Sequence, residues 1–334
     1  MTTIAHCKYD IFDRYIGRTM PQFPKGSIFG NPYVIGKDGT REEVIRKHKE
    51  WIFGLIEHPT VDRPSISDIM SLRGQTLGCW CRRKNEPKTQ YNHCHGDLYA
   101  ELADSKSYLE YCFSKTAHSS WKKIMCSEFD EKYMIALSSM LSRIDVSELC
   151  PLPHRIFRAF RLPFAKIKVV IVGQDPYPNT KHANGLAFAY AGKDSWPKSL
   201  RNVFRECGED QKATTFDPTL VHWMRQGVFL INTSLTTIQG KPGSHSAWGW
   251  QDFTELAVNR ISYKKNIVFL LWGKHAQSLK GSIEPGNLIL EAAHPSPFSC
   301  KDFFGCRHFS KTNSYLAKHN LRPIDWNYDI DLGD

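Results

Sequence analysis

The sequence predicts an α/β fold for its larger, C-terminal part: a three-layer αβα arrangement around a central four-stranded parallel sheet. Four short apolar runs, rich in β-branched residues, lie at 168–173, 228–231, 267–272 and 288–290. They are continuous rather than alternating, as strands covered on both faces are. The intervening stretches, roughly 15 to 50 residues long, leave room for the crossover helices that parallel strands require.

Helical patterns fill several of these stretches. Apolar residues recur at helical spacing in 200–207 and in 250–261, and Trp121 opens a helical region that runs to about Leu141. The alternation of buried runs and helical segments is the order that a parallel α/β domain shows along its chain.

The length of 334 residues, about twice that of a typical domain, predicts two domains. We assign residues 1–105 to a small N-terminal α/β domain, residues 106–120 to a linker and residues 121–334 to the larger domain. The linker contains several serines and no strong periodicity.

The N-terminal domain begins with a region rich in turn signals, Gly30-Asn31-Pro32 and Gly36 to Gly39. Thr40 then has the features of a helix N-cap, with Glu43 completing a capping box. Apolar or aromatic residues follow at helical spacing, at positions 44, 45, 48, 51, 52 and 55. A short apolar stretch at 77–81, a polar loop at 82–93 and a last helix after Cys94 complete the predicted order.

Composition excludes several classes of protein. Hydrophobic residues make up 41% and charged residues 23%, which is typical of globular domains. No apolar run is long enough to span a membrane, and the N-terminus has no signal-peptide core, so we expect a location in the nucleus or cytoplasm with the ten cysteines reduced. The net charge of +10, with +3 on residues 1–116 and +7 on the rest, favours polyanions such as nucleic acid.

Polar side chains follow the predicted strands. Asp175 comes after the first strand, Asn232 after the second and His294 after the fourth. Open α/β sheets bind ligands beyond the carboxyl ends of their strands, so we expect these side chains to meet at one edge. The alternative is that each residue caps its own loop, since Asn and Asp are frequent in turns.

The region from about residue 117 onward resembles the family 1 uracil-DNA glycosylases. The motifs that carry the resemblance occur in the family's order: 120–123 (SWKK), 173–177 (GQDPY), 185–188 (GLAF), 230–236 (LINTSLT), 244–245 (SH), 249–250 (GW), 294–297 (HPSP) and 304–313 (FGCRHFSKTN).

This resemblance implies a catalytic pair, Asp175 and His294, that hydrolyses the glycosidic bond of a uracil flipped out of DNA. Asp175 would orient a water molecule and stabilise positive charge on the sugar. His294 would donate a hydrogen bond to uracil O2 as a neutral ring, or act as an imidazolium acid. The sequence leaves both protonation states open.

The resemblance also implies four uracil-binding residues. The Asn232 amide matches uracil O4 and N3–H, whereas cytosine presents the opposite pattern. The Tyr177 ring would clash with the methyl group of thymine, Phe188 would stack on the base, and Gln174 would line the pocket chiefly through its backbone.

Loops rich in Ser, Pro and Gly resemble the family's DNA-binding loops, which implies backbone contacts by Pro197, Ser199, Ser244, Ser296 and Ser299. Phe298 stands where most relatives have leucine, as the wedge that enters the vacated base stack. Trp196 and Lys198 stand where prolines are common.

A second set of motifs lies at 15–18 (YIGR), 29–33 (FGNPY), 36–41 (GKDGTR), 77–81 (LGCWC) and 94–97 (CHGD). On these motifs residues 8–104 resemble a small domain of unknown function from phage, bacterial and large-virus proteins, a family that gives no activity to carry over. Cys79, Cys81, Cys94 and His95 could hold zinc, but their spacing departs from the usual pattern, and we expect buried thiols around Trp80 instead. A nucleotide or phosphate pocket is a further hypothesis for this domain, with the lining residues Arg18, Asn31, Lys37, Arg41, His95 and Asp97.

The leading hypothesis is therefore a monofunctional uracil-DNA glycosylase that initiates base excision repair. No lysine is placed to form a Schiff base, so we expect no strand cleavage. We expect a monomer without cofactor or metal that acts on single- and double-stranded DNA, and replication or repair proteins are candidate partners of its N-terminal domain. One alternative is a DNA-binding replication accessory factor that has lost catalysis. The other is a glycosylase with specificity shifted toward thymine.

Overall fold

The computed structural model describes residues 1–54, 56, 58–81, 94–105, 107–125 and 132–328. The chain forms two compact units: unit 1 comprises Met1–Cys112 and Ile135–Ser147, and unit 2 comprises Phe113–Met134 and Glu148–Asp334. Helix α4 (Tyr108–Thr116) lies in the segment that we assigned to a linker. The domain boundaries stay a prediction.

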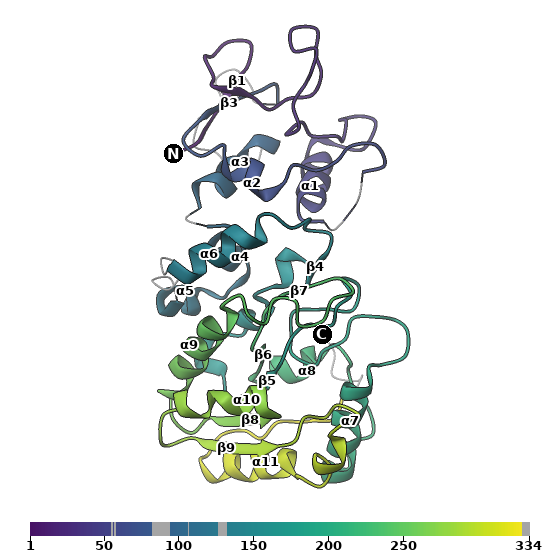
Figure 1. Ribbon diagram of the computed structural model, residues 1–334, viewed down its shortest axis with the longest axis vertical. Coiled ribbons are helices and arrows are strands. Elements are labelled where there is room, and N and C mark those ends of the chain that lie inside the picture. The colour runs from purple at the N-terminus through teal and green to yellow at the C-terminus, as the bar shows by residue number, and fades with distance from the viewer. Residues whose placement is uncertain (55, 57, 82–93, 106, 126–131, 329–334) are drawn as a thin grey trace. The chain divides into compact units, whose positions relative to one another are not determined.

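Unit 2 is built on four parallel strands in the order β6-β5-β8-β9 (Figure 1). They are β5 (Val169–Gly173), β6 (Val228–Asn232), β8 (Val268–Trp272) and β9 (Leu288–Ala292). Every residue of β5, β6 and β8 is buried, as continuous apolar runs predict. The predicted four-stranded parallel sheet is confirmed, but the edge strand β9 is only half-buried, so the expectation that all four runs are covered on both faces was wrong for this strand.

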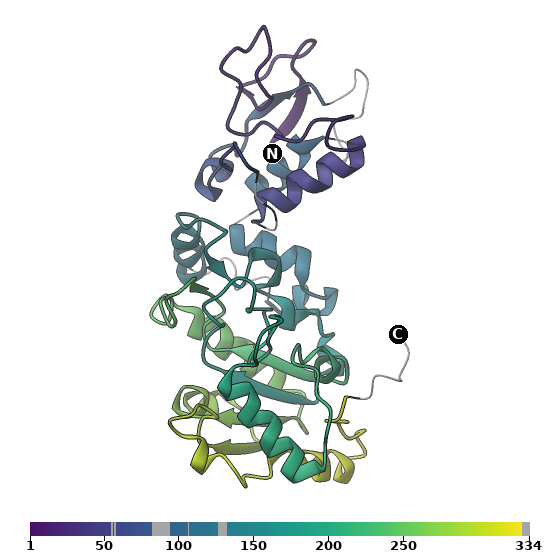
Figure 2. The ribbon, with the colours of Figure 1, turned by 90° about the vertical axis from the view of Figure 1, so that its right-hand side faces the viewer.

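Aromatic side chains pack on both faces of this sheet, which gives three layers. On one face Phe229 of β6 contacts Trp121 of α5 (Ser119–Met125), while Phe253 of α9 (Trp250–Ser262) packs on the neighbouring Phe160. On the other face Phe309 of α11 (His308–Lys318) contacts Trp272 of β8. Helices α7 (Lys198–Gln211) and α8 (Val221–Arg225) complete that face, and Figure 2 shows α7 in green along the sheet.

Shorter elements complete unit 2. Strands β4 (Leu149–Cys150) and β7 (Thr237–Ile238) pair antiparallel, and α10 (Lys274–Gln277) follows β8. In the described part of this unit, short 3₁₀ helices lie at Pro153–Arg155, Arg158–Arg161, Phe164–Lys166, Ser278–Ser282 and Cys300–Asp302. Helix α6 (Lys132–Leu141) begins in unit 2 and ends in unit 1.

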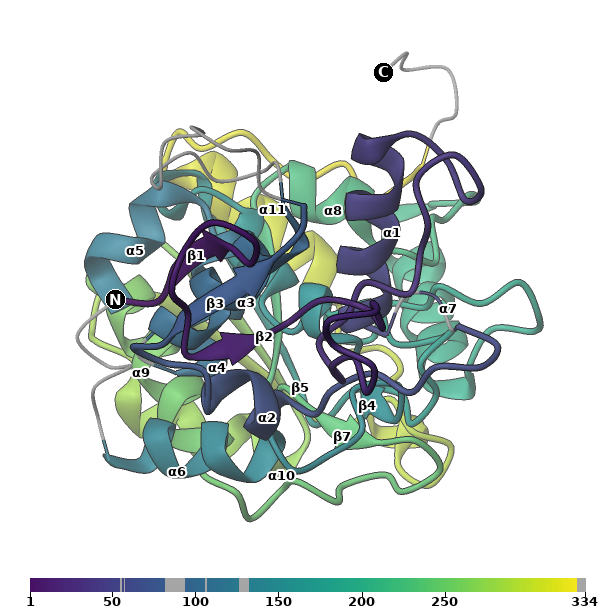
Figure 3. The same ribbon diagram turned by 90° about the horizontal axis from the view of Figure 1, so that it is seen from above.

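Unit 1 contains a parallel sheet in the order β1-β3-β2, formed by β1 (Thr3–His6), β3 (Thr76–Cys79) and β2 (Arg14–Tyr15) (Figure 3). Helices α1 (Arg41–Ile52), α2 (Ile66–Met70) and α3 (His95–Asp104) lie wholly within this unit. The capping box predicted for Thr40 and Glu43 is present. Position 55 of the predicted helix and the polar loop 82–93 lie outside the described residues.

None of the helices in the described ranges combines the length and the hydrophobicity that a bilayer span requires.

Candidate active site

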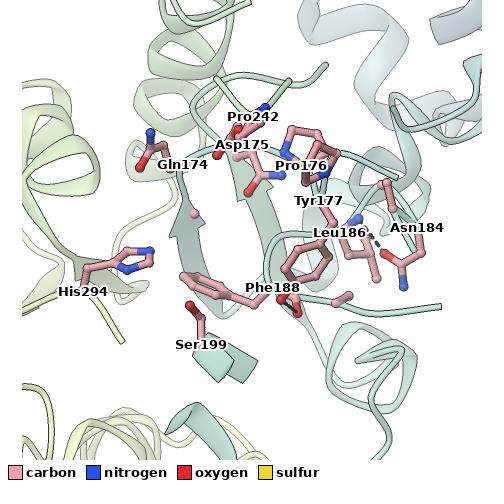
Figure 4. A pocket seen from close by; sticks show the side chains of 16 residues that line it. Gln174, Asp175, Pro176, Tyr177, Asn184, Leu186, Phe188, Ser199, Pro242 and His294 are labelled. Carbon is pink, nitrogen blue, oxygen red and sulfur yellow. Dashed lines mark hydrogen bonds between the residues drawn. The ribbon is translucent and has the colours of Figure 1, made fainter. Parts of the chain in front are cut away.

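The carboxyl ends of the strands in unit 2 border a cavity of about 220 Å³. Asp175, Asn232 and His294 all line it. Figure 4 shows Asp175 and His294 on two sides of the open volume with the Phe188 ring beside it. The acid, the carboxamide and the imidazole predicted from the strand ends therefore meet in one cavity.

The position of Asn232 is fixed by its strand. Asn232 is the last residue of β6, and it pairs with Gly173 at the end of β5. A Cβ atom at position 173 would lie 2.4 Å from Asn232 Oδ1, so only glycine allows the amide this close to β5. Asn232 itself is buried. The side chain is thus presented to the cavity with little freedom to move.

Asp175 is held by a backbone hydrogen bond. The Gly243 N–H donates to Asp175 Oδ2 at 2.7 Å. Burial raises the pKa of the Asp175 carboxyl, while the Gly243 hydrogen bond and the nearby His275 act in the opposite direction. The second carboxylate oxygen remains available to a water molecule or to positive charge in the cavity.

The protonation pattern of His294 follows from its neighbours. The Ser296 N–H donates to His294 Nδ1 at 3.0 Å, so this nitrogen carries no proton. Burial lowers the pKa of His294, and His275 lowers it further. The neutral ring therefore carries its proton on Nε2. Gly273 makes room for this ring, because its φ is +86° and an added Cβ would lie 2.7 Å from the Cβ of His294.

Two aromatic rings border the cavity. The Phe188 ring lies 5.8 Å from that of His294, and its backbone adopts a φ of +62°, an uncommon value for a residue other than glycine. Tyr177 donates a hydrogen bond from its hydroxyl to the Phe188 carbonyl at 3.1 Å. Burial raises the pKa of the Tyr177 hydroxyl, so it stays protonated as this donor. The contact ties the two rings to each other.

Gln174 lines the cavity, and a contact of its backbone with a bound base stays a prediction. The Gln174 carbonyl accepts hydrogen bonds from the Ser234 N–H and the Thr233 hydroxyl, both at 2.9 Å, whereas its side chain is exposed.

The predicted DNA-binding residues lie around or near the cavity rather than deep inside it. Ser199 lines the cavity in the first turn of α7, and Pro197 is the N-cap of that helix. The hydroxyls of Ser296 and Ser299 lie 3.0 Å apart, and Phe298 is wholly exposed. Ser244 accepts a hydrogen bond from the Ile238 N–H within its own loop. Contacts of these residues with DNA stay a prediction.

Sequence reasoning missed two contributors to the site. Gly243 is the hydrogen-bond donor to Asp175, although 68 residues separate them. His275 affects the pKa of both Asp175 and His294, and it lines a second cavity of about 250 Å³ that also includes Gly173, Gln174 and His294. The position of His275 shortly after the third strand was the available signal, because it places the residue at the same edge of the sheet.

In unit 1 the residues suggested for a phosphate pocket separate into two groups. Arg18, Asn31, Arg41 and His95 line one small cavity of about 70 Å³. Lys37 and Asp97 do not line it, and Asp97 instead accepts a hydrogen bond from the Cys94 N–H as part of the α3 cap.

Comparisons with known proteins agree with this geometry. Residues 161–317 match the uracil DNA glycosylase superfamily, and residues 5–105 match a domain of unknown function (DUF4326). A Borreliella burgdorferi uracil-DNA glycosylase is 46% identical over 215 residues, which cover 62% of this chain and 96% of the relative. A Porphyromonas gingivalis uracil-DNA glycosylase is 43% identical over 213 residues, with 62% and 96% covered.

A solved structure shows the same relationship. The crystal structure of mimivirus uracil-DNA glycosylase superposes with a TM-score of 0.61 at 27% identity, covering 65% of this chain and 89% of that one. The four strands of the parallel sheet and the residues that line the cavity lie within the matched residues 161–317. The chain belongs to the uracil-DNA glycosylase family, with a DUF4326 domain at its N-terminus.

Proposed function

We propose that Asp175 and His294 are the catalytic residues of uracil removal and that Asn232, Tyr177, Phe188 and Gln174 select the base. The observation that supports this most strongly is the protonation pattern of His294. The Ser296 N–H occupies Nδ1 and leaves Nε2–H as a donor in the cavity that Asp175 and Asn232 also line. A donor and a carboxylate in one cavity suit a reaction that separates an anionic base from a cationic sugar.

The reaction is the hydrolysis of the bond between C1′ of deoxyribose and N1 of uracil. As this bond breaks, the electron pair leaves with the uracil and positive charge develops on the sugar. The Asp175 carboxylate stabilises that charge and orients the water molecule that attacks C1′. The hydrogen bond from the Gly243 N–H holds the carboxylate in place for this role.

His294 stabilises the departing base. Its Nε2–H donates to uracil O2, and the bond strengthens as negative charge grows on that oxygen, which favours the transition state over the ground state. The depressed pKa of His294 and the hydrogen bond to Nδ1 support the neutral donor over the imidazolium acid. Uracil leaves as an anion, so a strong acid is not required.

Selection rests on hydrogen bonding and shape. Asn232 can accept from uracil N3–H and donate to O4, whereas cytosine would leave both groups unpaired in a buried site. The Tyr177 ring, tied to the Phe188 carbonyl, is positioned to exclude a methyl group at C5. Phe188 stacks on the base.

We propose that the enzyme is monofunctional and leaves the DNA strand intact. Among the described residues that line the cavity of about 220 Å³, none is a lysine, the residue that forms a Schiff base with a sugar aldehyde, and Lys274 lines only the adjoining cavity of about 250 Å³. The serine loops and exposed Phe298 would hold the DNA backbone and fill the vacated stack, in single- and double-stranded substrates alike.

A non-catalytic DNA-binding protein on the same fold is the second candidate function, and a thymine-directed glycosylase is the third. The placement of Asp175 and His294 in one cavity favours an enzyme over a non-catalytic DNA-binding protein. The hydrogen bond that holds the Tyr177 ring opposes a thymine-directed glycosylase. Protein partners of unit 1 and the monomeric state remain predictions from sequence.

One assay separates the three functions. The chain is incubated with single- and double-stranded oligonucleotides that contain uracil or a thymine mismatch, and the released base is measured. We expect uracil release that is lost in Asp175→Asn, with strand breaks only after alkali treatment. Tight binding without release would support the accessory protein, and thymine release would support the third function.

A further inference from the structure

Three thiols and one imidazole of unit 1 meet at a single point outside the active site. The Sγ atoms of Cys79, Cys81 and Cys94 and one ring nitrogen of His95 all lie within 4.8 Å of one another. We propose that these four residues bind one structural zinc ion. This proposal does not depend on the function that we propose for unit 2.

The separations fit a tetrahedral ion. With Zn–S near 2.3 Å and Zn–N near 2.0–2.1 Å, ligand atoms on a tetrahedron lie about 3.6–3.8 Å apart. His95 Nδ1 lies 3.5 Å from Cys79 Sγ and 3.2 Å from Cys81 Sγ. The Sγ atoms of Cys79 and Cys94 are 3.2 Å apart. Displacements of a few tenths of an ångström would bring these three pairs to ligand distances, and the widest pair in the cluster, at up to 4.8 Å, would close by about 1 Å.

His95 has the orientation of a metal ligand. Its Nε2 lies 2.9 Å from the Ile16 carbonyl, which can only accept, so Nε2 carries the proton. The lone pair on Nδ1 then faces the sulfur atoms. A histidine that binds zinc usually donates its other N–H to a carbonyl or carboxylate in this way, which fixes the tautomer and the ring orientation.

Backbone N–H groups donate hydrogen bonds to two sulfur atoms of the cluster. The Cys81 N–H donates to Cys79 Sγ at 3.2 Å, and the Gly96 N–H donates to Cys94 Sγ at 3.3 Å. Cys94 is the N-cap of α3, a helix of ten residues whose N-terminus attracts negative charge. Zinc binds the thiolate form of cysteine, so these contacts support metal binding.

The geometry also explains the unusual spacing that led us to expect simple buried thiols. Cys94 directs its sulfur toward the N-terminus of α3 from the cap position, while His95 reaches the same point from the first residue of the helix. Cys79 ends β3, and Cys81 follows two residues later. Adjacent ligands are possible because one belongs to the cap and the other to the helix.

A structural role follows from the ligand set. Four protein ligands leave no position open for a substrate, as in structural zinc sites. Two ligands come from the end of β3 and two from the start of α3, so the ion would join the central strand of a three-stranded sheet to a helix. A small unit with two-residue and four-residue strands gains much of its stability from such a link.

The first test is the metal content of the full chain. The protein is purified under reducing conditions without chelators, and zinc is measured by plasma mass spectrometry. We expect about one zinc per chain, and after its removal we expect Co²⁺ to give the absorption of tetrahedral thiolate coordination. Absence of zinc together with failure of the apo chain to take up Zn²⁺ or Co²⁺ would overturn the proposal.

Variants assign the ligands. Cys94→Ser and His95→Ala should each lose most of the zinc, whereas His95→Cys should retain it because thiolate replaces imidazole as a ligand. Cys112→Ser is the matched control, since Cys112 is a buried thiol of unit 1 outside the cluster, and it should keep its zinc.

Thiol counting separates zinc from a disulfide in the native full chain. Zinc predicts that the three cluster thiols react only after a chelator is added. A disulfide predicts that reductant alone exposes two of the three thiols and that no metal is released, and this result would overturn the proposal.

Discussion

Both units carry a cluster of polar side chains at the ends of parallel strands, but the two clusters differ in the space between their side chains. In unit 2 Asp175 follows β5 and Asn232 ends β6, while in unit 1 Cys79 ends β3, the central strand of a parallel sheet. The groups of unit 2 border a cavity of about 220 Å³, whereas those of unit 1 lie within 4.8 Å of one another. One arrangement keeps its groups apart around a volume for a base, and the other leaves room for a single ion.

Hydrogen bonds show the same difference. In the active site each group is held through one of its atoms. The Gly243 N–H donates to one oxygen of Asp175, and the Ser296 N–H donates to one nitrogen of His294. In the cysteine cluster they stabilise sulfur atoms that already face each other. Hence the active site should show its largest effects in catalysis, and the cluster should show its largest effects in stability.

The largest expected effect is the loss of activity in Asp175→Asn. The substitution removes the charge that stabilises the sugar cation, and single-turnover uracil release should fall by about 10²–10³-fold or more. The folded protein should be at least as stable as the wild type. Burial raises the pKa of Asp175, so at neutral pH the charged group weakens the folded state, and this unfavourable contribution disappears as the pH falls below the unfolded pKa.

The control for this variant is Asp252→Asn, an exposed carboxylate on α9 that should leave the rate unchanged. An Asp175→Asn protein that releases uracil within tenfold of the wild-type rate would contradict the proposed role. A clear fall in its melting temperature would instead indicate a structural role for the carboxylate.

The second prediction concerns specificity. Tyr177→Ala should release thymine at a measurable rate, because the ring that excludes the C5 methyl group is gone, while Tyr177→Phe should still reject thymine. Steady-state assays on matched oligonucleotides give the ratio of kcat/KM for the two bases. We expect Tyr177→Ala to lower the ratio of kcat/KM for uracil over thymine by about 10- to 200-fold, which corresponds to about 1–3 kcal/mol. If thymine release stays undetectable in Tyr177→Ala, exclusion by this ring is not the main barrier.

The third prediction uses the cysteine cluster to sharpen the comparison. Zinc at a free concentration 100 times its Kd would stabilise unit 1 by about 2.7 kcal/mol. For a unit of this size, its loss corresponds to a fall of roughly 10–20 °C in the unfolding midpoint. Calorimetry with and without a chelator measures this shift, while uracil release below that midpoint should stay unchanged. If a chelator abolishes uracil release while the chain remains folded, the cysteine cluster and the active site are not independent.

The smallest expected effect concerns pH. Activity needs Asp175 ionised and His294 neutral, so uracil release should fall as the pH drops through the pKa of Asp175, which burial holds above its usual value. The charge of His275 lowers the pKa of both groups, so His275→Gln should move this acid limb to slightly higher pH. A profile of kcat/KM against pH measures the shift, and a shift to lower pH would contradict the assigned electrostatics.

Local patterns were sufficient to predict the sheet and part of the site. Continuous apolar runs located the four strands, and a capping box located the start of α1, because both depend on residues close in sequence. The rule that strand ends converge then predicts that Asp175, Asn232 and His294 lie together.

Contacts between distant residues could not be predicted in the same way. The hydrogen bond from Gly243 to Asp175 spans 68 residues, and the assignment of Ile135–Ser147 to unit 1 joins segments far apart in the chain. The spacing of the cysteines in the sequence favoured buried thiols over a metal site, because spacing does not specify where a helix cap directs its side chain. Such features depend on the folded arrangement of loops, which sequence periodicity does not specify.

The central claim is that one cavity binds one uracil through His294 and Asn232 together, and a titration of the full chain with free uracil tests it most directly. Nitrogen-15 NMR would follow the His294 Nε2–H and the Asn232 side-chain amide. The account predicts that both signals shift with the same Kd, that His294 stays neutral throughout, and that thymine has no effect. Signals that titrate with different Kd values, or that do not respond to uracil, would contradict it.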